Sequence, residues 1–535
     1  MLKHNIKIAF ISSKRPLVPV IASLMLILLC IPVIIPTQEK VPLYSITREE
    51  LRDQIFFLAS DELEGRDTGS EGFAIAALYA VTQFKMSGLE PLIVGKDGKK
   101  TFFQSVPFSS YDTSNKSTFT ISSSTGETIL FHADKMVLFR NPSVGKNIFV
   151  DENPVFIGYG IDDPEIGWSD YDDVDVRGKV VFLVGGAPSK DGKPVFPPEK
   201  DSFYRDFGLS ANARIVTAMK HGVSALVFVP DPQMAKNWSN ISSSMNRRQF
   251  TLLLEDNKKV DSPALFGMHP DAVTEMLKNA GYDWTYGDHD YKPAVLENIK
   301  VSCSIEKDNE KEITCKNIVS LLPGTDPQLK EEYIVLHAHL DHLGINSNGQ
   351  VMNGADDNAS GCAVVLEVAE ALAIKPPKRS FIFVLFTGEE KGTLGSEWFV
   401  SHLPVPQEKI VLNATVDMIG RKSRRRPDVI YVTAEGKDKE NLFDIAKRAN
   451  QSLIQADIDF SLNEKDPDGH IMRCDTRPFL DKNITSLLFT RGFMGPVYHH
   501  PRDDAETLNY DKILKASRLL YLVLSEAGNL TNTHL

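Results

Sequence analysis

The chain is poor in the features that mark thiolate metal sites and nucleic-acid binding. Its 535 residues include only five cysteines, with no CxxC pair and no zinc-finger spacing, so metal binding by thiolates has no support. Acidic residues outnumber basic ones, 71 to 59, which gives a net charge of −12, and the one basic run is Arg421–Arg426. Because the acidic residues are scattered along the chain, we expect no nucleic-acid partner.

The length and composition are those of a globular protein. Hydrophobic residues make up 42% of the chain and charged residues 24%. This composition predicts a packed core, and the length is sufficient for more than one domain.

An apolar run at residues 16–36 follows a basic N-terminal flank. The run is close to the roughly 20 residues that span a bilayer. No A-x-A-like cleavage site follows it, which favours an uncleaved membrane anchor over a removed signal peptide. Because a positive flank stays in the cytoplasm, everything after Thr37 is expected to be extracytoplasmic, in the periplasm or at the cell surface.

Export would permit disulfide bonds. Cys303 and Cys315 lie symmetrically about the turn-like stretch 308–311, so they are candidate cross-strand neighbours in a hairpin. Whether they are bridged stays open at this point, because the sequence does not show the geometry that a disulfide requires.

Periodicity divides the rest of the chain. Thr47 and Glu50 have capping-box spacing before a helical pattern, and a second helix is expected from Phe73 to Met86. Between these helices, Arg66 and Asp67 are expected to form a local ion pair or, alternatively, to contact substrate. Short alternating strands begin near Phe102. We therefore expect a targeting segment at 1–41, the first part of the main domain at 42–130, a β-rich insert at 131–295 and the rest of the main domain at 296–535.

After residue 297, strands and helices alternate. The expected strands are 317–322, 333–338, 380–387, 410–416, 429–432 and 486–489, and the longer helices are 362–373, 439–453 and 510–526. Continuous apolar strands separated by amphipathic helices predict an α/β fold with a mixed, mostly parallel sheet and helices on both faces. Ligands bind such sheets beyond the carboxyl ends of the strands.

One of these strands ends in a cluster of polar side chains. The stretch 333–361 reads YIVLHAHLDHLGINSNGQVMNGADDNASG. Its apolar start is followed by His337, His339, Asp341 and His342, and then by the pair Asp356 and Asp357. Imidazole and carboxylate together form the ligand set that zinc favours.

Further candidate ligands stand where other strands stop: Glu389, Glu390, Asp417 and His499. Each alone has an ordinary explanation, such as a solvated glutamate pair, a helix cap or a surface histidine. These ordinary explanations do not account for all four residues together, because unpaired carboxylates at the ends of buried strands are costly to desolvate without a cation. The set predicts a hydrolytic metal site.

Five segments in the same order resemble the signature blocks of the dizinc aminopeptidase family in peptidase clan MH. They are HAHLDHLG, NGADDNASG, FTGEEKGTLGS, VDMIG and YHHPRDD, between about Asn317 and Asn509. The resemblance implies two Zn²⁺ per chain. The implied ligands are His339 and Asp417 for one ion, Glu390 and His499 for the other, and Asp357 shared by both.

The resemblance also implies roles for neighbouring residues. Glu389 is the expected general base, and Asp341 is expected to orient His339 from behind. Tyr498 is a candidate oxyanion donor, with core packing as the alternative. His337 and His342 are expected to pack or to hydrogen-bond near the site. One departure concerns residues 473–476, Arg-Cys-Asp-Thr, where many relatives have a Ser-Asp-His block.

Residues 151–232 resemble a protease-associated domain, the alternative being an unrelated β-rich insert. The expected function is removal of N-terminal residues from peptides. Two alternatives stay open: a carboxypeptidase or other amide hydrolase on the same scaffold, and a non-catalytic, membrane-anchored binding protein. The expected partners are a peptide substrate and, through residues 16–36, a membrane.

Overall fold

The computed structural model of the chain describes residues 41–531. The exceptions are 115, 124–127, 132–134, 141–146, 206, 231–234, 237, 239–247, 254–262, 280, 282–290, 347, 423–425, 464–469, 493, 494 and 496. The expected membrane anchor at 16–36 lies outside the described residues. Within them, no helix combines the length and the apolar composition needed to cross a bilayer.

Both expected N-terminal helices are present. Helix α3 (Arg48–Leu58) begins after Thr47, whose Oγ1 accepts a hydrogen bond from the Glu50 amide at 3.1 Å, as the capping box predicts. Helix α4 (Glu71–Met86) begins two residues before the expected Phe73, because the Ser70 hydroxyl caps its first turn.

In the described part of the chain, the main sheet has ten strands. Their order is β16 (Gln249–Leu252), β4 (Phe103–Thr113), β20 (Lys307–Leu322), β22 (Ser380–Phe386), β21 (Tyr333–His339), β23 (Ile410–Asp417), β26 (Ser486–Thr490), β24 (Ile430–Glu435) and β25 (Ile458–Asp459), with β1 (Glu90–Pro91) beside β20. The mixed sheet is confirmed. However, parallel pairing is limited to the central strands β22, β21, β23 and β26 and to the short pair β24–β25. The other strand pairs of this sheet are antiparallel, so the expectation of a mostly parallel sheet is wrong.

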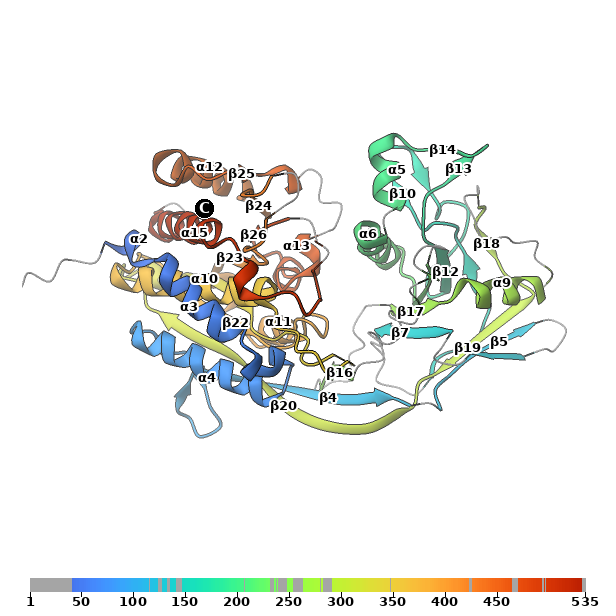
Figure 1. Cartoon of the computed structure of the whole chain (residues 1–535), viewed down its shortest axis with the longest axis horizontal. Coiled ribbons are helices and arrows are strands. Elements are labelled where there is room, and N and C mark those ends of the chain that lie inside the picture. Colours follow the sequence, from blue (N-terminus) through green and yellow to red (C-terminus); the bar gives the residue numbers. More distant parts are fainter. Residues whose placement is uncertain are drawn as a thin grey trace, which may run out of the picture. The chain divides into compact units, whose positions relative to one another are not determined.

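Helices cover both faces of this sheet (Figure 1). One face packs against α3, α4, α10 (Ser360–Ile374), α12 (Lys439–Ala449) and α15 (Tyr510–Asn529), and the other against α11 (Leu394–Ser401) and α14 (Arg477–Leu480). Alternate residues of each strand enter opposite cores: Ile334 and Leu336 of β21 join the first, and Val335 joins the second. The central strands are thus buried on both faces, as their continuous apolar sequences predict.

A buried polar contact joins helix α3 to helix α10. The Gln54 amide of α3 donates to Glu367 Oε1 of α10 at 2.6 Å. Burial, together with the negative charges of Glu50 and Glu370, raises the pKa of Glu367 to about 8. The Glu367 carboxyl is therefore held largely in its neutral form at pH 7.

In the described residues, the segment between β4 and β20 forms two larger sheets of its own, besides two sheets of two short strands each. One has the order β18 (Ala294–Val295), β9 (Val155–Phe156), β12 (Val180–Val184), β15 (Ala225–Val229), β17 (Ala264–Met268) and β7 (Met136–Arg140). The other has the order β6 (Thr128–Phe131), β5 (Thr118–Ser123), β19 (Ile299–Ser304) and β8 (Asn147–Glu152). Buried side chains of both larger sheets form one hydrophobic cluster, and the six-stranded sheet contributes to a second. The strands of these two sheets extend from Thr118 to Ser304, beyond the expected limits of 131 and 295.

One strand of the expected insert belongs to the main sheet instead. Strand β16 pairs antiparallel with β4, so that Leu252 lies opposite Phe108. The ring of Phe250 also meets that of Phe108 edge-on, with 6.0 Å between centroids. Sequence periodicity does not reveal this return, because strand pairing joins residues far apart in the chain.

The expected hairpin between Cys303 and Cys315 is wrong. Strand β20 continues from Lys307 as one long strand along β4, which places Cys315 opposite Val106, whereas Cys303 lies on β19 opposite Phe119. Both thiols are free and buried. Burial raises the pKa of each of these two cysteines to about 12.

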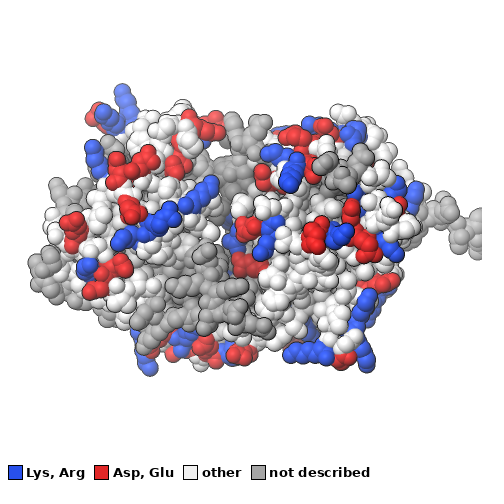
Figure 2. Space-filling view, turned by 180° about the vertical axis from the view of Figure 1, so that it is seen from behind, with Lys and Arg blue, Asp and Glu red and all other residues white. Residues whose placement is uncertain are grey.

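Charges of both signs are interspersed on the face shown in Figure 2. The described ends of the basic run are paired with acidic groups: Arg421 contacts Asp503 at 2.5 Å, and Arg426 pairs with Asp457 and Asp459. These pairs reduce the local positive charge that Arg421–Arg426 suggests in the sequence.

Candidate metal centre

The polar strand ends meet at one edge of the main sheet. His339 is the last residue of β21 and lies in register with Phe386, the last residue of the parallel neighbour β22. Asp417 is the last residue of β23 on the other side. Glu389 and Glu390 follow β22 after two intervening residues. Because parallel strands end at the same edge, residues far apart in the sequence come together here.

Asp357 lies between two imidazoles. Its Oδ1 is 3.2 Å from His339 Nε2, and its Oδ2 is 3.3 Å from His499 Nε2. The two oxygens of one carboxylate therefore face two different histidines, which is the arrangement expected of a ligand shared by two cations.

Two sets of potential donor atoms share this carboxylate. The first is completed by Asp417, whose Oδ1 lies 3.6 Å from His339 Nε2. The second contains Glu390, whose Oε2 lies 3.1 Å from His499 Nε2 and whose Oε1 lies 2.6 Å from His342 Nδ1. All five residues expected as metal ligands are thus brought together.

Asp341 contacts its expected partner in a different way. His339 Nδ1 lies 3.0 Å from the main-chain carbonyl of Asp341, so this nitrogen donates and Nε2 is left to face the carboxylates. The Asp341 carboxylate instead accepts hydrogen bonds from the amides of Glu389 (3.1 Å) and Glu390 (3.3 Å) and from the hydroxyl of Thr68 (2.9 Å). One residue therefore positions both the imidazole and the glutamate loop.

The other two histidines of the stretch differ from each other. His337 is buried, contacts the Thr415 hydroxyl at 2.9 Å and stacks on Phe479, in keeping with the expected packing role. His342 has a closer connection to the site through Glu390. The sequence analysis did not count His342 among the metal ligands, because the family pattern does not require it. Its place directly after Asp341 nevertheless indicated that it lies near the site.

His499 faces the acids and His500 does not. His499 has a φ of +52° and stacks on Tyr498 with 3.7 Å between ring centroids. The His500 ring accepts a hydrogen bond from the Arg502 amide at 3.1 Å, within its own loop. A left-handed backbone at a non-glycine residue costs about 1–3 kcal/mol, and such strain is typical of functional sites.

Arg66 connects separate segments around the site through hydrogen bonds to their main-chain carbonyls. Its buried guanidinium donates to the carbonyls of Leu340 (2.9 Å), Asn353 (2.9 Å) and Gly354 (3.0 Å), and also to that of Leu58. The expected ion pair with Asp67 is wrong, because Asp67 pairs with Lys391 at 2.5 Å.

A second group of contacts holds the segment that carries Asp357. The Asp503 carboxylate accepts from the amides of Asp356 and Asp357, each at 3.1 Å, while its other partner is Arg421. Asp356 in turn pairs with Arg491 at 2.8 Å. The shared carboxylate is thus fixed from behind by paired charges.

The buried carboxyl groups and imidazoles of the site favour the binding of a cation. Burial raises the pKa of the Glu389 carboxyl well above its usual range. Burial opposes protonation of His499, but the carboxylates of Glu390 and Asp357 outweigh it and raise the pKa of His499 to about 9. Asp417 Oδ1, Glu390 Oε1, His339 Nε2 and both ring nitrogens of His342 have no partner with hydrogen-bond geometry among the described residues, although His342 Nδ1 and Glu390 Oε1 are 2.6 Å apart. Such orphaned buried atoms are costly, and nitrogen and carboxylate donors suit zinc, so two zinc ions per chain fit this site.

Comparison with known proteins identifies this part of the chain. Residues 317–524 match the model of Peptidase family M28. This segment is an M28 peptidase domain. The match confirms the resemblance seen in the motifs, and it includes all of the candidate metal ligands.

Two curated proteins and a solved structure resemble the chain. Aminopeptidase YwaD of Bacillus subtilis is 29% identical over 37% of this chain and 41% of its own length. The alkaline phosphatase isozyme conversion protein of Escherichia coli is 32% identical over 22% of this chain and 36% of its own length. The chain thus spans less than half the length of either. An aminopeptidase from Aneurinibacillus sp. strain AM-1 matches 92% of this chain and 96% of its own with a TM-score of 0.50 and 17% identity, a likeness of fold alone.

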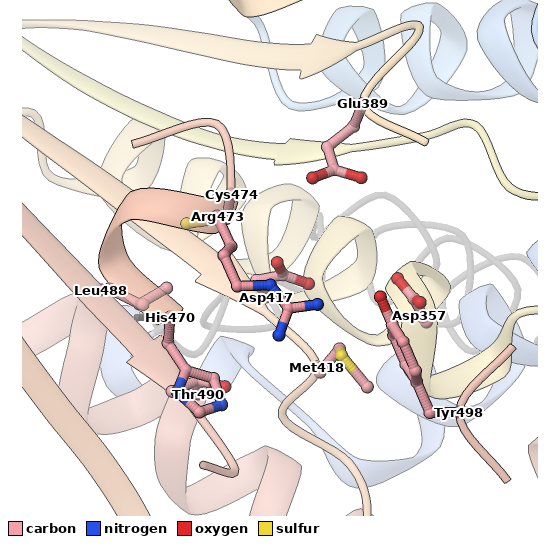
Figure 3. Close-up of a pocket in the computed structure, with 10 residues that line it drawn as sticks. All are labelled: Asp357, Glu389, Asp417, Met418, His470, Arg473, Cys474, Leu488, Thr490 and Tyr498. Carbon is pink, nitrogen blue, oxygen red and sulfur yellow. The ribbon is translucent and has the colours of Figure 1, made fainter. Parts of the chain in front are cut away.

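The M28 domain has a pocket beside the donor atoms (Figure 3). Glu389, Asp357 and Tyr498, the expected base, shared ligand and oxyanion donor, all line it. The remaining lining residues are Asp417, Met418, His470, Arg473, Cys474, Leu488 and Thr490. Asp475 is absent from this lining and accepts a hydrogen bond from the Ser396 hydroxyl at 2.6 Å. Sequence reasoning did not foresee that Arg473 and Cys474 would line the pocket.

Proposed function

We propose that the chain is a zinc-dependent aminopeptidase that hydrolyses the N-terminal peptide bond of peptides. The observation that carries the proposal is the sharing of Asp357 between two donor sets, with Glu389 lining the same pocket. YwaD, one of the similar proteins, is named an aminopeptidase, which supports the same reaction.

The proposed ligands divide between two metal positions. His339 and Asp417 would hold one zinc ion, Glu390 and His499 the other, and Asp357 both. Bound zinc lowers the pKa of water and polarises a carbonyl group, which is the chemistry that peptide hydrolysis needs. Asp341 keeps the Nε2 atom of His339 directed at the carboxylates through its main-chain carbonyl.

Glu389 is the proposed general base. Burial raises its pKa well above the usual range, so its carboxylate has a strong affinity for a proton. In our proposal it takes a proton from the attacking water and returns it to the leaving amine. The Tyr498 hydroxyl, in the same pocket, is the proposed donor to the developing oxyanion.

The test is hydrolysis of aminoacyl anilides with and without a chelator. The Glu389→Gln variant should keep its zinc and lose about 10²- to 10⁴-fold in kcat, the usual contribution of a general base. Glu408→Gln, at an exposed glutamate, is the matched control and should behave as wild type. Full activity of Glu389→Gln would make the assignment of the base wrong.

The end of the peptide that is cleaved needs a separate measurement. Dipeptides blocked at the carboxyl end should be hydrolysed, whereas those blocked at the amino end should not. The reverse result would establish the carboxypeptidase alternative. Zinc-free protein after purification in zinc-containing buffer would instead favour a non-catalytic binding protein.

We also propose that the peptidase acts outside the cytoplasm. The support is the sequence alone, in which basic residues precede the apolar run 16–36. Treatment of intact cells with an external protease, after permeabilising any outer membrane, should degrade the enzyme and leave cytoplasmic markers intact.

A further inference from the structure

The pocket of the M28 domain contains a positive charge that the proposed mechanism does not use. Arg473 ends the short helix α13 (His470–Arg473), and its side chain points into the pocket (Figure 3). It shares the pocket wall with the apolar side chains of Met418 and Leu488 and with the hydroxyl of Thr490.

The segment that carries Arg473 is anchored from behind. The Thr476 hydroxyl donates to Thr415 Oγ1 at 2.9 Å, and Asp475 is held by Ser396. Arg473 opens this Arg-Cys-Asp-Thr block. The guanidinium is therefore attached to a segment of the pocket wall that these contacts hold in place.

The position of Arg473 relative to the scissile bond follows from the other lining residues. Glu389, Asp357 and Tyr498 mark the part of the pocket in which the carbonyl group would react. Arg473 lines the same pocket as these three residues, and its side chain points into that pocket (Figure 3). The side chain of the residue being removed would then lie against the adjoining wall.

We propose that Arg473 gives the enzyme a preference for peptides with an acidic N-terminal residue, glutamate or aspartate. This inference rests on the proposed function, because it names the substrate class of the same site. A guanidinium binds a carboxylate through two parallel hydrogen bonds, which neither a leucine nor a lysine side chain can accept. A lysine side chain would in addition meet a like charge.

The expected preference is about 10- to 100-fold in kcat/KM, the range of one charge-assisted hydrogen bond. The experiment compares glutamyl, aspartyl, leucyl and lysyl anilides with the zinc-loaded full chain. The Arg473→Met variant should lose the acidic preference and favour leucine, and Arg473→Lys should be intermediate because it keeps the charge but not the planar fork. Arg448→Met, at an arginine whose side chain is 60% exposed on α12, is the matched control for loss of one positive charge.

Binding of the free amino acids separates this inference from the proposed function. Calorimetry should show that the zinc-loaded protein binds glutamate or aspartate more tightly than leucine, and that Arg473→Met reverses the order. If no anilide is hydrolysed but this binding order holds, the aminopeptidase proposal fails and the assignment of Arg473 stands. Preference of the wild type for leucine, or an acidic preference that survives in a folded, zinc-loaded Arg473→Met variant, overturns it.

Discussion

Replacing Glu367 with glutamine should make the free energy of unfolding less sensitive to rising pH. Glu367 is 2% exposed, and burial raises the pKa of its carboxyl from 4.5 to about 8. Since the folded state binds this proton more tightly than the unfolded chain, stability falls as pH rises from 4.5 to about 8 and then levels off. The loss is about 1.4 kcal/mol per pH unit, or about 5 kcal/mol over the whole interval.

Glutamine removes this pH-dependent loss of stability, because its side chain has nearly the shape of the neutral acid and carries no charge at any pH. It can still accept the hydrogen bond from Gln54. Urea unfolding of both proteins at pH 5.5 and pH 8 should show Glu367→Gln gaining about 3 kcal/mol relative to wild type across that range. Glu49→Gln, at an exposed residue of α3, controls for loss of one negative charge. A difference between Glu367→Gln and wild type that does not change with pH would refute the reasoning.

Three further predictions concern the metal site, the loops and the thiols. Asp357→Asn should lose both zinc ions on dialysis, because it removes the shared ligand; retention of one ion, measured by elemental analysis, would contradict sharing. Arg66→Met should lower the free energy of unfolding by about 4 kcal/mol or more, since four carbonyls lose their donor. A change as small as that of the exposed Arg52→Met would show that those bonds contribute little. Cys303 and Cys315 should react with a thiol reagent in urea without reductant, and failure to react would point to a bridge.

Much of the M28 domain could be predicted from local sequence patterns. Strand 333–338 and helix 362–373 were expected within a few residues of their observed ends, because apolar runs and helical spacing are local signals. The pairing of β16 with β4 and the length of β20 were not predicted. Both depend on which strands meet, and strand pairing is set by contacts between distant residues.

The candidate ligands were predictable because they stand where apolar strands stop. Asp417 illustrates this, since it closes β23 and faces His339. The sequence did not predict the contact of the Asp341 main chain with His339 or the contacts of Arg66 with main-chain carbonyls, because neither follows from residue type. They arise from the path of the backbone around the site, which spacing along the sequence does not encode.

The position of β16 has a consequence for protein engineering. Strand β4 is paired with β20 on one side and with β16 on the other. A shortened peptidase that lacked residues 118–304 would therefore expose the backbone amides and carbonyls of β4 to other copies, and such edges promote aggregation. A designer who wants the catalytic half alone has to supply a replacement edge strand, or a charged or proline-bearing β4, before the deletion yields a soluble enzyme.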